Sequence, residues 1–142
     1  MKNFFLSRIA LTVAIATGLH LTRGSAAEQS GKPLRGLIIT GGCCHNYKFQ
    51  TQAIQDGISK KANVEWTVVN EGGTGTRAEI DLYDDADWAK PFDVIIHNEC
   101  FADTKDPEYI TRITEAHKSG KPAMVIHCAM HTYRAAQEDH WR

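Results

Sequence analysis

The segment Ala-Met-Val-Ile-His-Cys-Ala-Met-His-Thr-Tyr-Arg, residues 123 to 134, decides how the rest of the chain is interpreted. Its first half is a short apolar run that follows the turn signal Ser-Gly-Lys-Pro, so it predicts a fully buried strand. The run stops at His127, Cys128 and His131, side chains that can bind a metal or move a proton, and Thr132 can begin a helix. A buried strand that turns sharply into a helix, with titratable groups at the corner, is typical of α/β enzymes. We therefore expect this corner to carry function.

Three other apolar runs predict strands upstream, at residues 34–40, 64–70 and 92–97. Apolar residues at helical spacing from Phe49 to Ile58 predict an amphipathic helix over 48–61. A second helix is predicted to begin at Asp106-Pro107 and to end at Gly120. Because strands and helices alternate, the sequence predicts an α/β domain with a mainly parallel sheet.

The carboxyl ends of parallel strands form the ligand crevice of such a sheet. Most of the chemically active side chains of this chain follow a predicted strand. These segments are 41–45, 70–75, 97–100 and 127–131. We therefore expect one shared rim to carry the functional site.

The first 27 residues have the pattern of a secretory signal peptide. Lys2 and Arg8 come first, an apolar run extends from Ile9 to Leu19, and small residues follow at 25–27. The run is too short to favour a membrane anchor. We expect cleavage and export to the periplasm or the extracellular space, a linker over 28–33, a domain over 34–142, and no membrane association afterwards.

The charge pattern argues against nucleic acid or anionic lipid as a partner. The formal net charge is −1, and acidic and basic residues are interspersed. Small molecules or proteins are the expected partners.

Several strand-end motifs together resemble the ThuA (trehalose-utilisation) family of the class I glutamine amidotransferase-like superfamily. They are Ile38-Ile39-Thr40-Gly41-Gly42 with His45, Phe92-Asp93-Val94-Ile95-Ile96, and Val125-Ile126-His127-Cys128-Ala129 with His131 and Tyr133-Arg134. The resemblance covers residues 34–142. It implies a flavodoxin-like three-layer fold and a secreted, hydrolase-like protein of carbohydrate metabolism, acting on a trehalose or keto-disaccharide type of sugar.

Two departures limit what this resemblance implies. His127 stands where amidotransferases of the superfamily hold a nucleophilic cysteine between glycines, and Cys128 lies one position later. We therefore do not expect glutamine amidotransferase activity. Members of the family also continue past the position of Arg142, so the sequence predicts a fragment whose C-terminal part is missing.

Three hypotheses describe the chemistry of the rim. The first is a divalent-metal site, with zinc as the natural ion, because imidazoles and a carboxylate suit it; its ligands would be His45, Glu99, His127 and His131. The second is metal-free catalysis on a sugar, in which His127 or His131 moves a proton and Glu99 orients it. Both use the same predicted ligand-binding residues: Gly41, Gly42, His45, Asn98 and Tyr133.

The third hypothesis is a non-catalytic carbohydrate- or protein-binding module. Its aromatic platforms would be Tyr47, Tyr133 and Trp141, although aromatic residues are more often part of a core.

The cysteines allow two interpretations. Cys43, Cys44 and Cys100 lie at the ends of strands expected to be neighbours, so a disulfide after export is predicted, with Cys44–Cys100 as the pair. Alternatively, Cys128 is a nucleophile paired with His45 or His131.

Overall fold

The structure of the protein is a computed structural model, which describes residues 31–136. The predicted signal peptide, residues 28–30 of the linker, and residues 137–142, which include Trp141, lie outside the described residues. None of the helices within 31–136 is long and apolar enough to cross a bilayer.

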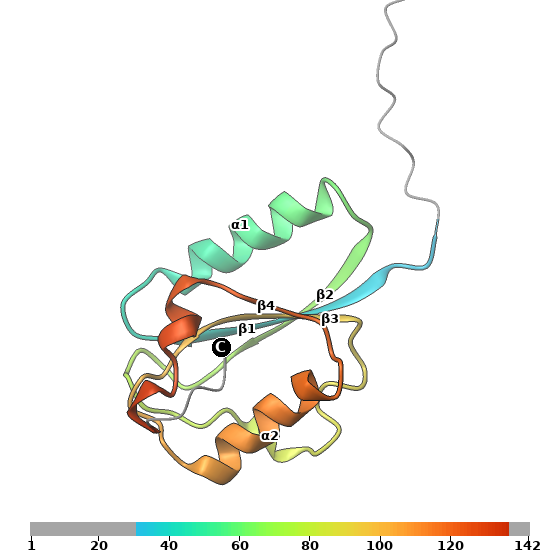
Figure 1. Ribbon diagram of the computed structural model, residues 1–142. Coiled ribbons are helices and arrows are strands. Elements are labelled where there is room, and N and C mark those ends of the chain that lie inside the picture. The colour runs from blue at the N-terminus through green and yellow to red at the C-terminus, as the bar shows by residue number, and fades with distance from the viewer. Residues whose placement is uncertain (1–30, 137–142) are drawn as a thin grey trace, which may run out of the picture.

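A four-stranded, all-parallel sheet forms the centre of the fold (Figure 1). Its strands are β1 (Leu34–Gly42), β2 (Val64–Asn70), β3 (Val94–Cys100) and β4 (Ala123–Val125), in the order β2-β1-β3-β4. Apolar runs such as Leu37-Ile38-Ile39 form the central strands because both faces of the sheet are covered. The parallel α/β architecture is therefore confirmed, and it is consistent with a flavodoxin-like three-layer fold.

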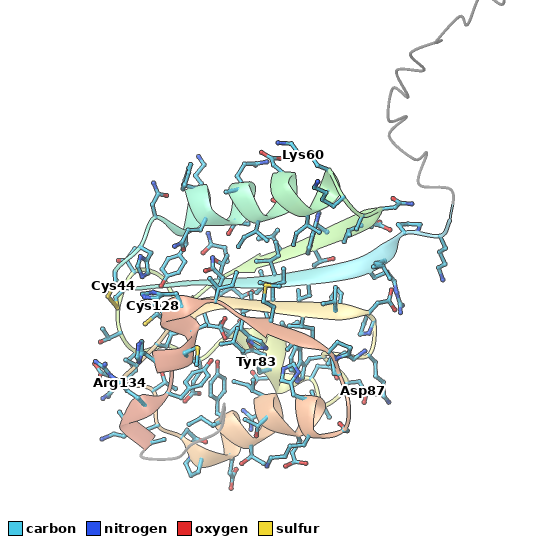
Figure 2. The ribbon with its side chains drawn as sticks, turned by 45° about the horizontal axis from the view of Figure 1, so that its top comes forward. Cys44, Lys60, Tyr83, Asp87, Cys128 and Arg134 are labelled. Carbon is cyan, nitrogen blue, oxygen red and sulfur yellow. A yellow bond between two sulfur atoms is a disulfide. The ribbon has the colours of Figure 1, made fainter. Side chains whose placement is uncertain are left out.

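The two α-helices cover opposite faces of the sheet. Figure 1 shows α1 (Tyr47–Ser59) on one side and α2 (Pro107–Lys118) on the other. Both begin at a capping side chain: Asn46 Oδ1 accepts from the Phe49 amide at 3.1 Å, and Asp106 Oδ1 accepts from the Tyr109 amide at 2.8 Å. Figure 2 shows the same layers, with Lys60 at the end of α1 and Tyr83 beyond the other face of the sheet.

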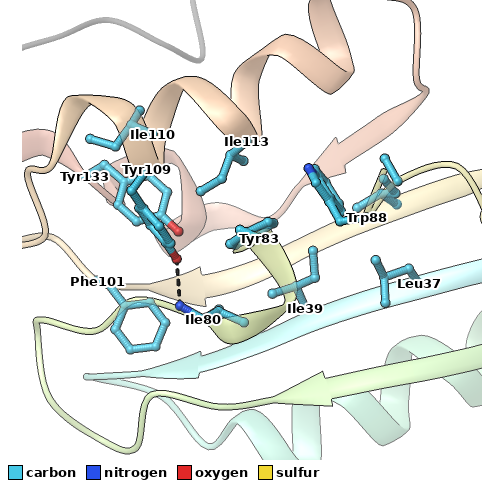
Figure 3. Close-up of a cluster of buried hydrophobic side chains, with 12 residues drawn as sticks. Leu37, Ile39, Ile80, Tyr83, Trp88, Phe101, Tyr109, Ile110, Ile113 and Tyr133 are labelled. Carbon is cyan, nitrogen blue, oxygen red and sulfur yellow. Dashed lines mark hydrogen bonds between the residues drawn. The ribbon is translucent and has the colours of Figure 1, made fainter. Parts of the chain in front are cut away.

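The main hydrophobic core lies between the sheet and α2 (Figure 3). Most of its members come from β1, β3, α2 and the loop around the 3₁₀-helix η1 (Asp81–Asp84). They include Leu37, Ile39, Ile80, Tyr83, Trp88, Ile95, Phe101, Tyr109, Ile110, Ile113 and Tyr133. The rings of Tyr83 and Trp88 pack edge to face at 4.8 Å, and the Tyr109 hydroxyl accepts from the Ile80 amide at 2.9 Å. Because each fully buried large apolar side chain contributes about 1.5–3 kcal/mol, this face supplies most of the apolar stabilisation.

The α1 face is more thinly covered. The buried residues of α1 are Tyr47 and Thr51, whereas Phe49 is 69% exposed. The predicted helix is present, but Phe49 lies outside the stripe that faces the sheet.

The C-terminal segment differs most from the prediction. β4 is short, and Met124 is 53% exposed, because within the described residues β4 pairs only with β3 and forms an edge of the sheet. The strand predicted to be fully buried is therefore an exposed edge strand. A short 3₁₀-helix, η2 (His127–His131), precedes Thr132, and within the described residues the predicted helix after Thr132 is a second one, η3 (Arg134–Ala136). Thr132 lies between them, and its hydroxyl accepts from the Phe101 amide at 3.0 Å.

Candidate functional site

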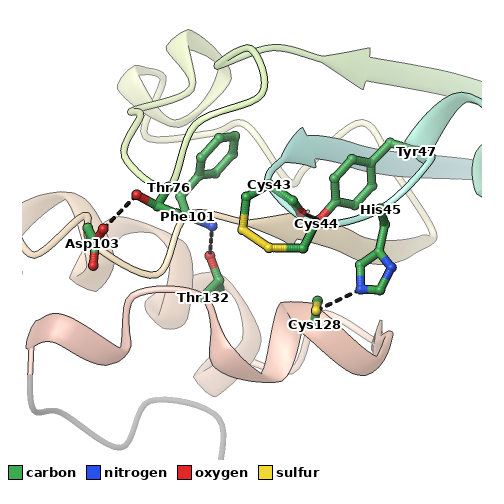
Figure 4. Close-up of a disulfide and its surroundings, with 9 residues drawn as sticks. All are labelled: Cys43, Cys44, His45, Tyr47, Thr76, Phe101, Asp103, Cys128 and Thr132. Carbon is green, nitrogen blue, oxygen red and sulfur yellow. Dashed lines mark hydrogen bonds between the residues drawn. A yellow bond between two sulfur atoms is a disulfide. The ribbon is translucent and has the colours of Figure 1, made fainter.

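The candidate site lies where the parallel strands end. The chain leaves β1 towards β2 on one side of the sheet, and β3 returns on the other side of β1. The carboxyl ends of β1 and β3 therefore flank a topological switch point, which is where open α/β sheets bind ligands. The loop after β1 and the start of η2 meet at this end (Figure 4), so the predicted convergence of these strand ends is observed.

Three donor side chains gather at this rim: His45, His127 and Cys128. One ligand atom from each lies within 4.8 Å of the others. His45 Nε2 lies 2.8 Å from Cys128 Sγ, and the His45 and His127 rings pack edge to face at 5.7 Å. Both histidines are exposed and Cys128 is half-buried. Two imidazole nitrogens and one thiolate form a three-ligand set that suits zinc.

The backbone at His127 gives this cluster its shape. His127 has φ +32°, in the left-handed region that non-glycine residues rarely adopt. The Ile126 amide donates to the His97 carbonyl at 2.9 Å, so the chain is still held to β3 immediately before the turn. The turn brings both His127 and Cys128 to the rim, so Cys128 joins the donor set although it was not among the predicted metal ligands.

The loop after β1 holds His45. Tyr47 donates its hydroxyl to the Cys43 carbonyl at 2.7 Å, and its ring packs edge to face against His45 at 6.0 Å. Burial, with the neighbouring acidic groups, raises the pKa of Tyr47 above its ordinary value, so the hydroxyl remains a donor. This contact supports the position of the imidazole.

Gly41 and Gly42 are required by backbone packing, so their presence does not depend on a bound ligand. Both have positive φ, at 138° and 96°. A Cβ at Gly41 would collide with the Glu71 carbonyl, and one at Gly42 would collide with the Cys100 carbonyl. The two glycines therefore let neighbouring backbones approach closely at the end of the sheet.

Glu99, predicted as a metal ligand and an orienting group, does not join the cluster. Side chains alternate along a strand, so Glu99 faces α2 together with Ile95 and His97. Its side chain is fully buried, and Oε1 lies 2.9 Å from His97 Nδ1 and accepts a long hydrogen bond from the Tyr83 hydroxyl at 3.5 Å. The prediction that Glu99 lies at the rim with the histidines is therefore wrong.

His97 and His117 extend this buried chain, and the sequence had not singled them out. His97 Nε2 lies 3.0 Å from His117 Nε2, and His117 Nδ1 lies 3.0 Å from the Lys121 carbonyl. A carbonyl only accepts, so His117 Nδ1 carries a proton; burial lowers the pKa of His117, which favours the neutral ring with Nε2 as acceptor. His97 Nε2 then donates to His117 Nε2. Side chains alternate between the two faces of a strand, so the sequence could have indicated that residues 97 and 99 of β3 lie on the same face.

The remaining predicted residues fall into two groups. Asn98 is buried and donates to the Thr40 hydroxyl at 3.3 Å, and Tyr133 is buried against Tyr109. Neither is placed to contact a ligand, and buried Tyr47 and Tyr133 are not stacking platforms. His131 is exposed, with its ring 6.5 Å from that of His127. It borders the three-residue cluster without joining it.

The disulfide also differs from the prediction. Cys43 pairs with its neighbour Cys44, and Cys100 and Cys128 are free thiols. Cys100 is opposite Gly42 in the register of β1 and β3, and it is buried, whereas Cys44 is exposed beyond the end of the strand. Cys44 adopts φ +85°, a conformation that the sequence pattern could not reveal.

Comparison of the chain with family models, with curated proteins and with solved structures finds no match. The resemblance to the ThuA family therefore stays a prediction from the motifs.

Proposed function

We propose that the chain is an exported, ThuA-like, zinc-dependent enzyme of carbohydrate metabolism that is hydrolase-like and uses the rim cluster as its reactive centre. One observation supports this proposal above all others. Donor atoms of His45, His127 and Cys128, from two segments more than 80 residues apart, lie within 4.8 Å of one another beside the switch point of the sheet.

The donor set fits a catalytic rather than a structural zinc site. Structural sites use four protein ligands, whereas catalytic sites keep three and leave one position open. His45 and His127 are exposed, so a substrate can approach from solvent. A zinc ion held there would supply Lewis-acid activation of a substrate oxygen or of water.

His131 is the proposed proton-transfer residue. Its imidazole is exposed next to His127 and is not one of the three clustered donors. An imidazole can act as a general acid and give a proton to the leaving oxygen of a sugar. Glu99 has no place in this mechanism, because its side chain is buried against His97.

The substrate class rests on the resemblance of the motifs to the ThuA family, which points to a keto-disaccharide or a trehalose-type sugar. The even charge distribution of the chain suits a neutral ligand of this kind.

A second candidate, a cysteine nucleophile, is favoured by one specific contact. Cys128 Sγ lies 2.8 Å from His45 Nε2, which is the distance of a nucleophile from its general base. The two candidates differ in one test, because a chelator abolishes the zinc-dependent reaction and leaves a thiol-dependent reaction intact. The alternative of a non-catalytic binding module predicts ligand binding without turnover.

The test is turnover of keto-disaccharides by the metal-stripped protein, by the same protein with zinc restored, and by two variants. We expect activity only with zinc, and a loss of at least about tenfold in His45→Ala. His131→Ala is the matched control for metal binding, since it should bind zinc normally and lose turnover. Zinc-independent turnover would contradict the metal proposal, and absence of turnover in every form would leave only the binding module.

A further inference from the structure

All four cysteines of the chain gather at the same end of the sheet. The Cys43–Cys44 disulfide follows β1 directly, and Cys100 is the last residue of β3. The Cys43 amide donates to the Cys100 carbonyl at 3.4 Å. Cys128 lies on η2, and Figures 2 and 4 both show it beside the disulfide. A disulfide and two free thiols therefore share one small region.

The two free thiols, Cys100 and Cys128, lie on the same side of the sheet. Side chains two positions apart on a strand point to the same face, so Cys100 points to the same side of the sheet as Asn98. Asn98 donates to Thr40 on the α1 side, which is the side on which Cys128 lies. This placement is what two thiols need to form a disulfide with each other.

Cys128 also has a proton acceptor and a nearby electrophile. His45 Nε2 lies 2.8 Å from its sulfur, and His45 directly follows Cys44 in the chain. Cys44 is exposed, and its backbone has φ +85°, a conformation that L-residues rarely adopt. The sulfur of Cys44 is therefore the accessible end of the disulfide.

We propose that the rim is a thiol–disulfide exchange centre in which Cys128 and Cys100 reduce the Cys43–Cys44 disulfide and become a disulfide themselves. The Cys128 thiol gives its proton to His45 Nε2, its sulfur bonds to Cys44, and the bond to Cys43 breaks. Cys43 leaves as a thiolate and takes the proton from His45 Nε2. Cys100 then loses its proton to solvent and attacks the Cys128 sulfur, and Cys44 leaves as a thiolate that takes up a proton from solvent.

The reaction balances within the chain. One disulfide breaks, one forms, and two protons pass from the attacking to the leaving sulfurs, so no external oxidant is needed. The consequence rests on the proposed zinc site. A thiolate is the form of cysteine that binds metal, so Cys128 within a disulfide cannot be a ligand. The exchange centre thereby makes the zinc site responsive to redox state.

Peptide mapping after alkylation tests the exchange directly. Trypsin separates Cys100 from Cys128, and both from the peptide that carries Cys43 and Cys44. Metal-free protein with the Cys43–Cys44 bond intact is incubated without oxygen, alkylated and digested. We expect linked Cys100 and Cys128 peptides, with new alkylation at Cys43 and Cys44. Cys100→Ser should trap the mixed disulfide between Cys128 and the Cys43–Cys44 peptide, and Cys128→Ser should form no new link.

Zinc provides the second measurement. Zinc added before the incubation should suppress the linked peptides, and after exchange zinc should bind at least about tenfold more weakly until a phosphine reductant restores it. Full alkylation of Cys128 in the wild-type protein, with no peptide linked to it, would overturn the exchange proposal. If exchange occurs but zinc does not bind, the exchange proposal is supported and the proposed zinc function is contradicted. If zinc binds but no exchange occurs, the zinc function is supported and the exchange proposal is contradicted.

Discussion

Two clusters near the carboxyl end of the sheet use similar side chains for opposite purposes. On the α2 face, His97, Glu99 and Tyr83 are buried and bonded to one another. At the rim of the α1 face, His45, His127 and Cys128 lie partly in solvent with their donor atoms pointing at one another. The buried group borders the hydrophobic core between the sheet and α2, whereas the rim residues lie in the loop after β1 and on η2.

This difference separates stability from chemistry. A buried ionisable group must be paired, so each member of the Glu99 network is needed by the others. An exposed cluster of donor side chains does not stabilise the fold. One of its members, His127, also has a left-handed backbone conformation, which costs stability. Substitutions on the two faces should therefore have opposite signatures.

The largest effect is expected from Glu99→Leu. The change leaves His97 buried beside an apolar side chain, and the loss of one partner from a buried pair costs about 3–5 kcal/mol. Urea denaturation of the purified domain measures this loss, with exposed His131→Ala as the control. An unchanged free energy of unfolding in Glu99→Leu would show that the network is not a stabilising unit.

A smaller loss is expected from Tyr83→Phe, which removes only the hydroxyl that donates to Glu99. A single hydrogen bond of this kind contributes about 0.5–1.5 kcal/mol, and the 3.5 Å distance favours the lower end. Zinc affinity should not change, because Tyr83 lies away from the rim. A weaker zinc site in this variant would mean that the two faces are coupled.

At the rim, we expect His127→Gly not to lower the free energy of unfolding. Glycine adopts positive φ readily, so this variant should keep the wild-type stability or gain up to about 1 kcal/mol, while losing zinc binding. His127→Ala, which retains the backbone conflict, is the matched comparison. A clear loss of stability in the glycine variant would argue that the His127 side chain is structural.

The pH dependence gives the finest comparison. Burial lowers the pKa of His117 below its ordinary 6.5. Between the lowered folded value and 6.5 the unfolded chain binds a proton that the folded chain does not, so stability falls as the pH is lowered through this window. His117→Gln should flatten that fall, and His131→Ala should not. Denaturation at a series of pH values from 7 downwards measures the slope, and identical slopes would remove His117 as its source.

The sequence predicted the frame of the molecule well. Continuous apolar runs and helical spacing predicted the strands and both helices, and the rule that parallel strands end at one edge predicted that His45 and His127 would meet. These are consequences of local periodicity, which a single sequence contains.

The parts that failed depend on backbone conformation and on neighbours. Cys128 was left out of the predicted metal ligands, because the left-handed turn at His127 cannot be deduced from the sequence pattern. The Cys43–Cys44 disulfide was missed, and the positive φ of Cys44 is equally invisible in the pattern. Glu99 was predicted to lie at the rim, although it is four positions after Ile95 on the same strand and therefore points to the same face, into the core. Burial of β4 was overestimated because its apolar residues do not reveal that the strand lies at an edge.

We propose that metal chemistry belongs to the rim and not to the buried network. Calorimetric titration of zinc into wild-type protein, Cys128→Ser and Glu99→Gln tests it, with folding of each variant verified by circular dichroism. We predict one zinc per chain in the wild type, at least about tenfold weaker binding in Cys128→Ser, and unchanged affinity in Glu99→Gln. Weaker binding in Glu99→Gln with none lost in Cys128→Ser, or no binding by the wild type, would contradict the account.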